Sequence, residues 1–548
     1  MTKRSIKKAK DSKQEIVQVK QKINQDKQII VHSNDFTKFL YSNNIKSTAI
    51  FAIIIVLAGF LLYVRTINYD LVYFDDDRLI LHVQDFNEKL SNIKETFKKT
   101  IGVTYYRPIL ATSFILDAQV AGVEIWFYRL TNLIYHILAS VLIYYGLIKI
   151  KIPNPYSFFL GLFVVLHPIL TPAAVWISGR NDSLITIFVM LSFITMVSFL
   201  DNKTSTKWIF FVLHILVFAL SLFTKESAAL FPFVAFAYII MIRKDKMFSN
   251  ENAFLGVVWF IIGLIWFSMR NSAMGPGPNP DSVGIEAFIS NFPAIFALIG
   301  KLILPIRLSA VANFDSFSII SGIVFLAIFF FILFYFKNLD KRNIIFGIIW
   351  FFVLLTPTLM VRIKIDYFDY AEHRVFLPIF GILIILYEIV KTLKIDFRKV
   401  APLVITGVIL IALAGRSFSY ERAFSQGLAF WTHFVKKYPE NPMGNFNRAE
   451  ILFFRNYHDK ADEFYMNAIK YDNPKKTFVG NFIAMTFPSF FPPNELSLDS
   501  YKQSVGPQGF SFISLHNYLA SRYLLKGYPA NAEKRSEEHT SELQSPNT

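Results

Sequence analysis

Three consecutive carboxylates form the first group of residues in this sequence whose type and spacing could support chemistry. Asp75, Asp76 and Asp77 follow a long apolar segment and the pair Tyr73-Phe74. Adjacent carboxylates repel one another and lose solvation beside an apolar surface, and both effects raise a carboxyl pKa toward the range of a general base. The alternative is a helix N-cap, because acidic residues stabilise the start of a helix. Successive helical residues point about 100° apart, so at most one or two of the three could face one ligand.

Further charged residues recur beside later apolar segments. Arg107 lies in the same loop as the carboxylates, and its planar guanidinium group suits an anionic phosphate. Contact with lipid headgroups is the alternative role for this side chain. Ionisable groups at the edge of a membrane span are functional candidates by default. The candidates for binding a phosphate-bearing substrate are Arg107, Arg180, Asp182, Lys225, Glu226, Glu372, His373 and Arg374.

Each later cluster also has a structural interpretation. Arg180 and Asp182 could pair only with each other. Lys225 and Glu226 could form a local ion pair, and residues 372–374 could anchor a helix at the membrane interface. These alternatives stay open at the level of sequence.

Two histidines and the third carboxylate carry weaker signals. His136 is expected to be packed among other side chains, and His167, which precedes Pro168, to order a broken helix. Asp77 is predicted to have either a structural role or a role in the site. No His-x3-His spacing occurs, so the sequence predicts no metal site. We expect no tightly bound cofactor, and the sequence does not decide whether a divalent metal is needed.

The composition indicates a membrane protein. Of 548 residues, 53% are hydrophobic and 18% are charged, whereas soluble proteins average about 45–50% and about 25%. Soluble globular, disordered and collagen-like classes are therefore excluded. The absence of cysteine excludes disulfide frameworks, cysteine nucleophiles and cysteine metal sites. In a membrane protein the net charge of +16 reflects cytoplasmic Lys and Arg rather than a nucleic-acid partner.

Long apolar segments predict about eleven transmembrane helices, because a spanning helix needs roughly 17–25 apolar residues. Basic residues concentrate on the cytoplasmic side, which places the N-terminus inside and the C-terminus outside. The segment 290–306 contains prolines and a lysine, so we expect a re-entrant or interfacial helix there, with twelve crossings as the alternative. The expected spans are 48–64, 127–149, 158–176, 184–200, 208–223, 228–242, 253–269, 317–336, 344–361, 375–390 and 401–415.

This topology brings the charged clusters to one side of the membrane. Residues 1–47 would form a basic cytoplasmic tail, and residues 48–415 the transmembrane domain. The first outer loop, 65–124, and the later charged clusters would all lie on the outer side. Sequence-distant polar groups could then surround a single cavity at the level of the lipid headgroups.

The remaining residues have the composition of a soluble protein. Within 416–534, Ala449, Ala461, Tyr465 and Ala468 follow a pattern similar to tetratricopeptide (TPR) repeats, and a second occurrence lies at 520–532. An unrelated helical hairpin is the alternative. Residues 535–548 resemble a translated DNA-sequencing adapter, so they are excluded from fold reasoning. We expect further repeats beyond this truncated array.

Five blocks of residues together resemble the GT-C superfamily of membrane glycosyltransferases. The closest branch is the protein O-mannosyltransferases and the transmembrane, TPR-containing O-mannosyltransferase-like proteins. Two departures are the third acid, Asp77, and His373, where relatives often have Arg or Tyr. The blocks are Phe74-Asp75-Asp76, Tyr106-Arg107-Pro108 with Ser113-Phe114 and Leu116-Asp117, His167-Pro168 through Trp176–Asp182, Thr224-Lys225-Glu226, and Ala371–Pro378.

The resemblance implies an all-α GT-C-like bundle and an inverting sugar transfer. A polyprenyl-phosphate-linked sugar, with mannose expected, would be the donor and co-substrate, and a protein hydroxyl the acceptor. Asp75 or Asp76 would be the catalytic base. The repeats would recruit the acceptor protein, and the enzyme would lie in a prokaryotic cytoplasmic membrane with its active site facing outward.

Two other functions are carried forward. One is a GT-C enzyme with a lipid or glycan acceptor, and the other is a non-catalytic scaffold or a transporter. A transporter is expected to carry its binding groups on broken helices near mid-membrane. A structure that scattered the charged clusters over separate surfaces would favour the scaffold.

Overall fold

A computed structural model describes residues 38–42, 44–102, 105–243, 249–275, 283–363, 367–368 and 370–471. Most of the basic tail, the second repeat signature at 520–532 and the adapter-like end at 535–548 lie outside the described residues. The described part is helical except for an isolated bridge and a short ribbon, in which β1 (Arg362–Ile363) pairs antiparallel with β2 (Tyr367–Phe368). The all-α prediction is confirmed.

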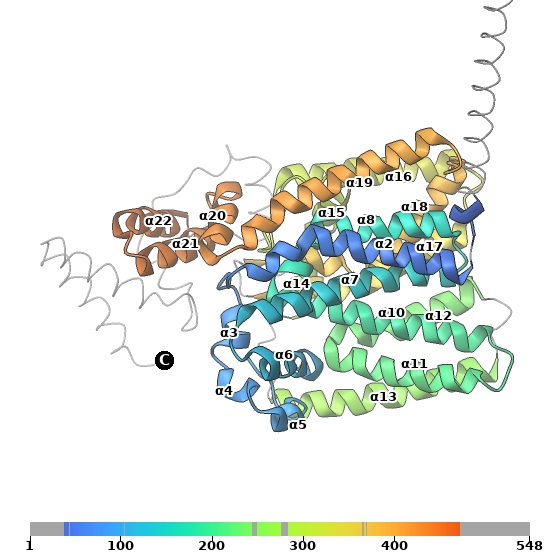
Figure 1. The fold of residues 1–548 in the computed structure, drawn as a ribbon, viewed down its shortest axis with the longest axis horizontal. Helices are drawn as coiled ribbons and strands as arrows, with labels where there is room; N and C mark the ends of the chain where they lie inside the picture. The colour runs from blue at the N-terminus through green and yellow to red at the C-terminus, as the bar shows by residue number, and fades with distance from the viewer. Residues whose placement is uncertain are drawn as a thin grey trace, which may run out of the picture.

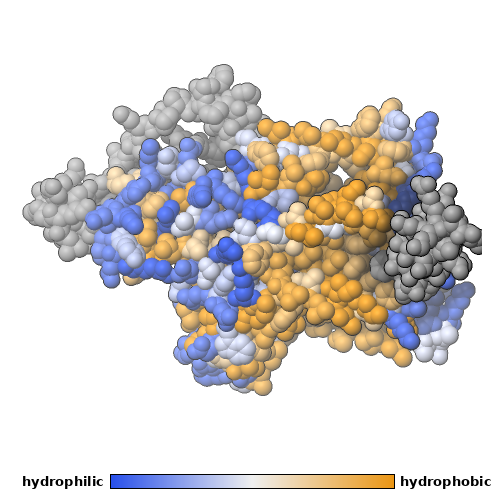
Figure 2. Space-filling view, turned by 45° about the horizontal axis from the view of Figure 1, so that its top comes forward, coloured by the Kyte–Doolittle hydropathy of each residue, from blue (hydrophilic) through white to orange (hydrophobic). Residues whose placement is uncertain are grey.

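Eight helices of the described chain are long and apolar enough to cross a membrane. They lie side by side in Figure 1, and Figure 2 shows their hydrophobic residues as a broad band between two hydrophilic ends. The chain is therefore an integral multi-pass membrane protein. The cores of these spans are α2 (Ile45–Tyr63), α7 (Ile125–Lys149), α10 (Arg180–Asp201), α11 (Lys207–Thr224), α13 (Asn250–Met274), α16 (Ser316–Tyr335), α17 (Lys341–Leu359) and α19 (Val400–Tyr420).

The predicted count of eleven crossings is not confirmed. Two further spans exist only if each of two bent helix pairs is one crossing, which gives at most ten in the described residues. α8 (Asn154–Leu166) meets η3 (Pro168–Leu170) and α9 (Thr171–Val175) at 50°, and α14 (Ile285–Asn291) meets α15 (Pro293–Ile303) at 43°.

Three of the predicted spans, 158–176, 228–242 and 375–390, are not single long helices in the structure. Pro168 and Pro293 begin the second halves of the two bent pairs, where a proline lacks the N–H that would continue the helix. The other two predicted spans contain short helices, η5 (Glu226–Leu230) with α12 (Phe231–Met241), and α18 (Ile379–Thr392). The bend in α14–α15 is the geometry of a broken span or of a re-entrant loop, so both topologies for 290–306 stay predictions.

Glycines allow two helix pairs to touch backbone to backbone. A Cβ atom on Gly300 of α15 would lie 2.1 Å from the Ser318 carbonyl of α16, and one on Gly322 would lie 1.8 Å from the Phe296 carbonyl. Gly347 and Gly381 form the same contact between α17 and α18. Small residues at such contacts drive helix association in membranes, where van der Waals packing replaces the hydrophobic effect. Any side chain at these glycines would separate the helices.

Short helices cover the end of the bundle that carries the acidic loop. After α2 the chain forms a series of short elements and then α6, which lie together at one end of Figure 1. The tail helices leave the bundle at the same end. These elements are η1 (Val64–Asn68), α3 (Asp76–Ile80), α4 (Gln84–Asn87), η2 (Leu90–Asn92), α5 (Ile93–Thr96), α6 (Pro108–Ala121), η9 (Glu421–Phe424), α20 (Gly427–Lys437), α21 (Pro442–Phe454) and α22 (His458–Tyr471).

The tail begins with a helical hairpin whose contact residues match the predicted pattern. Ala449 of α21 packs with Ala461 and Tyr465 of α22, and all three are fully buried. The first tail helix also contacts the bundle, because Lys437 Nζ donates to the Leu308 carbonyl at 2.6 Å. A longer repeat array stays a prediction, since its other units lie outside the described residues.

Candidate functional site

The acidic loop places its three carboxylates in different environments. Asp75 occupies the position before α3 with a left-handed backbone (φ +67°), and its side chain is 45% exposed. Asp76 is completely buried. Asp77 lies 3.9 Å from His82 Nε2. Of the two predicted bases, Asp75 is therefore the one that a ligand can reach.

Asp76 holds the loop in shape. Its Oδ2 accepts from the Val72 N–H at 2.7 Å, and its Oδ1 accepts from the Phe74 and Asp77 N–H groups at 3.0 and 3.2 Å. Burial raises the pKa of Asp76 to about 6, although these amides and the nearby Arg129 act in the opposite direction. The N-cap interpretation does not describe Asp75, because its side chain accepts no hydrogen bond from the start of α3.

Arg129 joins the acidic loop to two other parts of the chain. Its guanidinium group is buried and donates to the backbone carbonyls of Asp70, Val175 and Phe424. These carbonyls belong to the acidic loop, to α9 and to η9 at the start of the tail. Sequence reasoning missed Arg129. Its position near the start of an apolar helix was the available signal, because an arginine there needs polar partners.

Six of the predicted binding residues come together at the starts and ends of helices. We call them the charged cluster: Arg107, Asp182, Lys225, Glu226, His373 and Arg374. They come from the N-terminus of α6, the first turn of α10, the junction of α11 with η5, and η8 (Glu372–Val375). Four sequence-distant segments therefore converge, as the predicted topology requires of a single site.

Ion pairs within the charged cluster cross between helices. Arg107 binds Glu226 in a bidentate manner, with Nη2–Oε1 and Nε–Oε2 distances of 2.7 and 3.2 Å. Lys225 Nζ donates to Asp182 Oδ1 at 2.7 Å, and His373 Nε2 lies 3.6 Å from Asp182 Oδ2. The local pairing of Lys225 with Glu226, considered from the sequence, is therefore wrong.

Two residues complete the electrostatics of the charged cluster. Arg374 acts electrostatically on Arg107, Asp182 and Lys225. Asn181 reaches Arg107 Nη1 at 3.0 Å when its amide is oriented to satisfy both groups. The cluster holds three permanent cations and two carboxylates, so with a neutral histidine its net charge is +1. Such a surplus favours an anionic ligand.

Trp176 connects the acidic loop with the charged cluster. Its indole stacks on Phe74, with ring centroids 5.2 Å apart, and Nε1 donates to the Phe74 carbonyl at 2.8 Å. The edge of the same indole meets His373, at a centroid distance of 5.4 Å. Phe74, the residue before Asp75, is thus linked to His373 of the cluster through one aromatic side chain.

Arg180 is a correction to the predicted site, because it is not available to a ligand. Its three nitrogens donate to Asn132, Asp117, Ser113, Thr131 and the Tyr128 carbonyl, at 2.6 to 3.3 Å. A guanidinium group has five N–H donors, so all of them are used within the protein. Its pairing with Asp182 is also wrong, since the carboxylate that it meets is Asp117.

Glu372 likewise lies in a separate network. Its Oε1 accepts from Lys301 Nζ at 2.6 Å and its Oε2 from the Ser309 N–H at 2.9 Å. Lys301 also approaches Asp315, at 3.5 Å. Lys301 was visible in the sequence as the lysine within the apolar segment 290–306. Glu372 therefore ties η8 to α15 and does not join the charged cluster directly.

The two candidate histidines are packed, as the sequence predicted. His136 lies among Tyr63, Phe376 and the Val165 carbonyl. His167 Nδ1 accepts from the Ile169 N–H at 3.2 Å, and Nε2 meets the Leu302 carbonyl at 2.9 Å, so the side chain orders the break after α8. Among the described residues, no group of three His, Asp or Glu side chains could hold a metal ion.

Comparisons with known proteins agree with the resemblance stated above. No family model matches the chain. Human protein O-mannosyl-transferase TMTC2 is 27% identical over 195 residues, which is 34% of this chain and 23% of the relative. Protein O-mannosyl-transferase F38B6.6 of Caenorhabditis elegans is 21% identical over 389 residues, 67% of this chain and 54% of the relative. The chain thus resembles protein O-mannosyl-transferases and spans about a quarter to a half of their length.

Two solved structures are similar to the chain only at low TM-scores. The crystal structure of ArnT from Cupriavidus metallidurans in the apo state has a TM-score of 0.40 and 14% identity, covering 79% of this chain and 76% of that one. The structure of the same protein bound to undecaprenyl phosphate has a TM-score of 0.38 and 14% identity, with 80% and 76% coverage.

Proposed function

We propose that the protein is a membrane glycosyltransferase that moves a sugar from a polyprenyl-phosphate donor to a protein hydroxyl, with Asp75 as the base. Mannose is the first sugar to test, because the curated relatives are named protein O-mannosyl-transferases. The observation that carries the proposal is the arrangement of the site. Asp75 is an exposed carboxylate, and the preceding residue, Phe74, is linked through Trp176 to a cluster with a net positive charge.

In the proposed step, Asp75 removes a proton and the charged cluster stabilises the leaving phosphate. An acceptor hydroxyl attacks the anomeric carbon, its proton passes to Asp75, and the bond from that carbon to the phosphate oxygen breaks with inversion. The leaving phosphate keeps the electron pair, so its charge changes from −1 to −2. Arg107, Lys225 and Arg374 would stabilise this added charge, and such donors act more strongly on the transition state than on the substrate.

Asp75 is preferred to Asp76 because the two carboxylates have opposite surroundings. A base must come within hydrogen-bonding distance of the proton it removes. Asp76 is buried and its oxygens face three backbone amides, whereas Asp75 faces solvent from a left-handed backbone. A non-glycine residue in that conformation costs roughly 1–3 kcal/mol, and such strain clusters at functional sites. Asp76 would then be the residue that keeps Asp75 in position.

In this structure Arg107 is already occupied by Glu226. Next to it, Thr96, Lys99 and Tyr105 line a space of about 10 Å³, which would hold only about one water molecule. A donor phosphate would therefore have to replace the Glu226 carboxylate at Arg107. The proposal includes this exchange, in which Glu226 keeps Arg107 oriented until the donor binds.

The test is sugar transfer by the purified chain from a polyprenyl-phosphate mannose. Asp75→Asn should lower kcat by at least about 100-fold, the usual contribution of a positioned base, without lowering thermal stability, because the side chain is exposed. Asp77→Asn is the matched control and should keep most of the activity. Full activity in Asp75→Asn would refute the assignment of the base.

Analysis of the products separates the possible acceptors. Label recovered on a protein hydroxyl would support the proposal, whereas label on a lipid or glycan would replace the acceptor class. The same assay in inside-out and right-side-out vesicles tests the proposed outward-facing site in a prokaryotic cytoplasmic membrane. The convergence of six candidates at one end of the bundle argues against a non-catalytic scaffold or a mid-membrane transport site.

A further inference from the structure

The loop between α15 and α16, residues 304–315, is bonded through its backbone to two other parts of the chain. The four consecutive carbonyls from Pro305 to Leu308 accept hydrogen bonds from side chains of α19 and of the tail. The next N–H group, that of Ser309, donates to the carboxylate of Glu372 in η8. The loop therefore lies between the start of the tail and the turn that carries two members of the charged cluster.

A single peptide group in this loop connects the tail with η8. Lys437 Nζ of α20 donates to the Leu308 carbonyl at 2.6 Å, and His433 Nε2 meets the same oxygen at 3.3 Å. The N–H of the same peptide group belongs to Ser309 and donates to Glu372 Oε2 at 2.9 Å. A peptide group is planar, so its C=O and N–H move as one unit. A cation on the carbonyl also polarises the N–H toward its acceptor.

Burial strengthens this connection. Leu308, Ser309 and Glu372 are buried, and Lys437 is partly buried. Hydrogen bonds and charge interactions are stronger in such surroundings than in water. Lys437 also attracts the Glu372 carboxylate electrostatically. The tail lysine therefore acts on Glu372 both through the shared peptide group and directly.

Glu372 stands immediately before the two members of the charged cluster that η8 carries. His373 Nε2 lies 3.6 Å from Asp182 Oδ2, and Arg374 acts electrostatically on Asp182. The second oxygen of Glu372 accepts from Lys301 Nζ at 2.6 Å, so both of its oxygens are bonded. Because η8 is a single turn, the bonds to its first side chain help to set the direction in which the next two side chains point.

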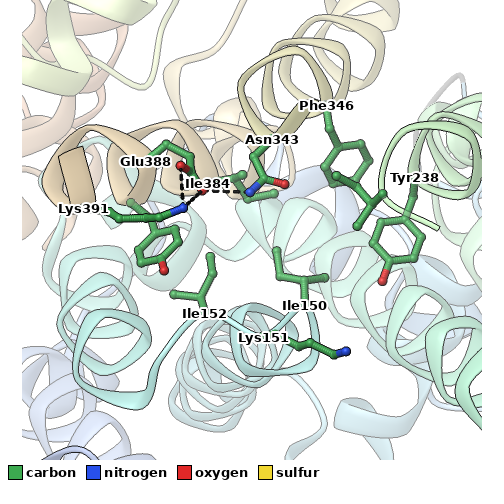
Figure 3. Close-up of a pocket in the computed structure, with 11 residues that line it drawn as sticks. Ile150, Lys151, Ile152, Tyr238, Asn343, Phe346, Ile384, Glu388 and Lys391 are labelled. Atoms are coloured by element: carbon green, nitrogen blue, oxygen red, sulfur yellow. Dashed lines mark hydrogen bonds and ion pairs between the residues drawn. The ribbon is translucent and has the colours of Figure 1, made fainter. Parts of the chain in front are cut away.

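A second buried carboxylate, near the other end of α18, provides a contrast. Glu388 is completely buried and accepts from Asn343 Nδ2 at 2.8 Å and from Lys391 Nζ at 3.1 Å (Figure 3). Lys391 follows Glu388 by about one turn of the same helix and is half exposed. These partners belong to α17 and α18, at the end of the bundle away from the acidic loop. Glu388 is therefore a buried carboxylate whose loss should cost stability without affecting the charged cluster.

We propose that Lys437 is a positioning residue for the charged cluster, which it orients through the Leu308–Ser309 peptide group and Glu372. The first helix of the tail then helps to complete the site that stabilises the leaving phosphate, in addition to the proposed recruitment of an acceptor. The catalytic consequence rests on the proposed function, whereas the connection from Lys437 to η8 does not.

The first measurement is amide hydrogen exchange of a peptide covering 370–378 in the full chain. The variants are Lys437→Met, Lys437→Arg and Arg416→Met, and the pH is 6, because burial lowers the pKa of Lys437 to about 7. Arg416→Met is the matched control, since Arg416 donates to the Pro305 and Ile306 carbonyls of the same loop at 3.0 and 2.7 Å. Lys437→Met should raise exchange about tenfold, as expected for the loss of a hydrogen bond from a charged group. Lys437→Arg and Arg416→Met should stay close to the wild type.

The second measurement separates positioning from acceptor recruitment in the sugar-transfer assay. Lys437→Met should lower kcat about tenfold and leave the acceptor KM unchanged, because the charged cluster acts on charge that develops in the transition state. Lys437→Arg should restore kcat, since a guanidinium group can donate to the same carbonyl. The effects of Lys437→Met and Glu372→Gln on kcat should be non-additive, whereas those of Lys437→Met and Glu388→Gln should be additive.

The outcomes decide the proposal. Unchanged exchange at 370–378 in Lys437→Met overturns the connection. An equal rise in Arg416→Met also overturns it, because the effect would then come from a general loosening of the loop. A raised acceptor KM with unchanged kcat would assign Lys437 to acceptor recruitment instead. If the wild type transfers no sugar, the proposed function fails, and the exchange measurement still decides the connection.

Discussion

The pH dependence of the acidic loop tests which force dominates at Asp76. Burial favours the protonated carboxyl, whereas the three backbone N–H donors favour the carboxylate. In this structure burial prevails, and the pKa of Asp76 is raised from 3.8 to about 6. A folded-state pKa above the unfolded value means that the group stabilises the loop at low pH, and that this contribution is lost as the pH rises through 6. Asp76→Asn removes the titration while keeping the shape of the side chain.

The size of the effect follows from the difference between the two pKa values. A difference of 2.2 units (6 − 3.8) corresponds to about 3 kcal/mol at 1.36 kcal/mol per unit. Amide hydrogen exchange of a peptide covering 70–82 reports the opening of the loop. Comparison of the wild type with Asp76→Asn at each pH cancels the intrinsic exchange rate. From pH 4 to pH 7 the protection of the wild type relative to the variant should fall by about two orders of magnitude.

A relative protection that stays flat or rises from pH 4 to pH 7 would refute this reasoning. It would mean that the hydrogen bonds from Val72, Phe74 and Asp77 outweigh burial and hold the carboxylate ionised. Asp75→Asn is the matched control, because this neighbouring carboxylate is exposed and makes no hydrogen bond to the start of α3. Its relative protection should change little over the same range.

Two further predictions concern the contacts that hold the site together. Arg107→Met and Glu226→Gln, alone and combined, should show a coupling of about 1–3 kcal/mol in thermal stability, because they form a bidentate pair; a coupling near zero would contradict the pair. Trp176→Phe keeps an aromatic ring against Phe74 but removes its hydrogen bond, and should cost about 1 kcal/mol and lower sugar transfer. Trp431 is the control, because its Nε1 has no hydrogen-bond partner in the described residues. Trp431→Phe should therefore cost less stability, and equal losses of stability in the two variants would contradict the role of Trp176.

The sequence was sufficient to predict that candidate residues meet at one end of the bundle, but not to predict how their charges pair. Apolar length and the distribution of lysine and arginine placed distant clusters on one side of the membrane, and six of the candidates do meet there. Which cation meets which carboxylate depends on how the helices rotate and pack. One geometric rule was available, because residues one or two apart on a helix do not face each other. This rule disfavours pairing of Arg180 with Asp182, and in the structure Arg180 forms its ion pair with Asp117 instead.

The number of spans was less predictable than their existence. An apolar segment of sufficient length indicates a helix in the membrane, but a proline within it allows the helix to break. The break at Pro168 is stabilised by His167, whose Nδ1 accepts from the Ile169 N–H just after the interruption and whose Nε2 meets the Leu302 carbonyl of α15. Hydropathy carries no information on such a contact, because the Leu302 carbonyl comes from a distant helix. The expected role of His167 in a broken helix nevertheless came from its position before proline.

The breaks themselves explain how charged side chains can gather at this end of the bundle. Within the described chain, α9, η4 (Ile177–Gly179), η5 and η8 interrupt or precede the helices that carry the charged cluster. A continuous helix satisfies its own backbone and presents only side chains, whereas irregular backbone at membrane depth is tolerated only where it is buried in protein or lines a cavity. Arg129 and Trp176 satisfy carbonyls at these interruptions and at the acidic loop. The same side chains therefore both permit the breaks and tie the acidic loop to the elements that carry them.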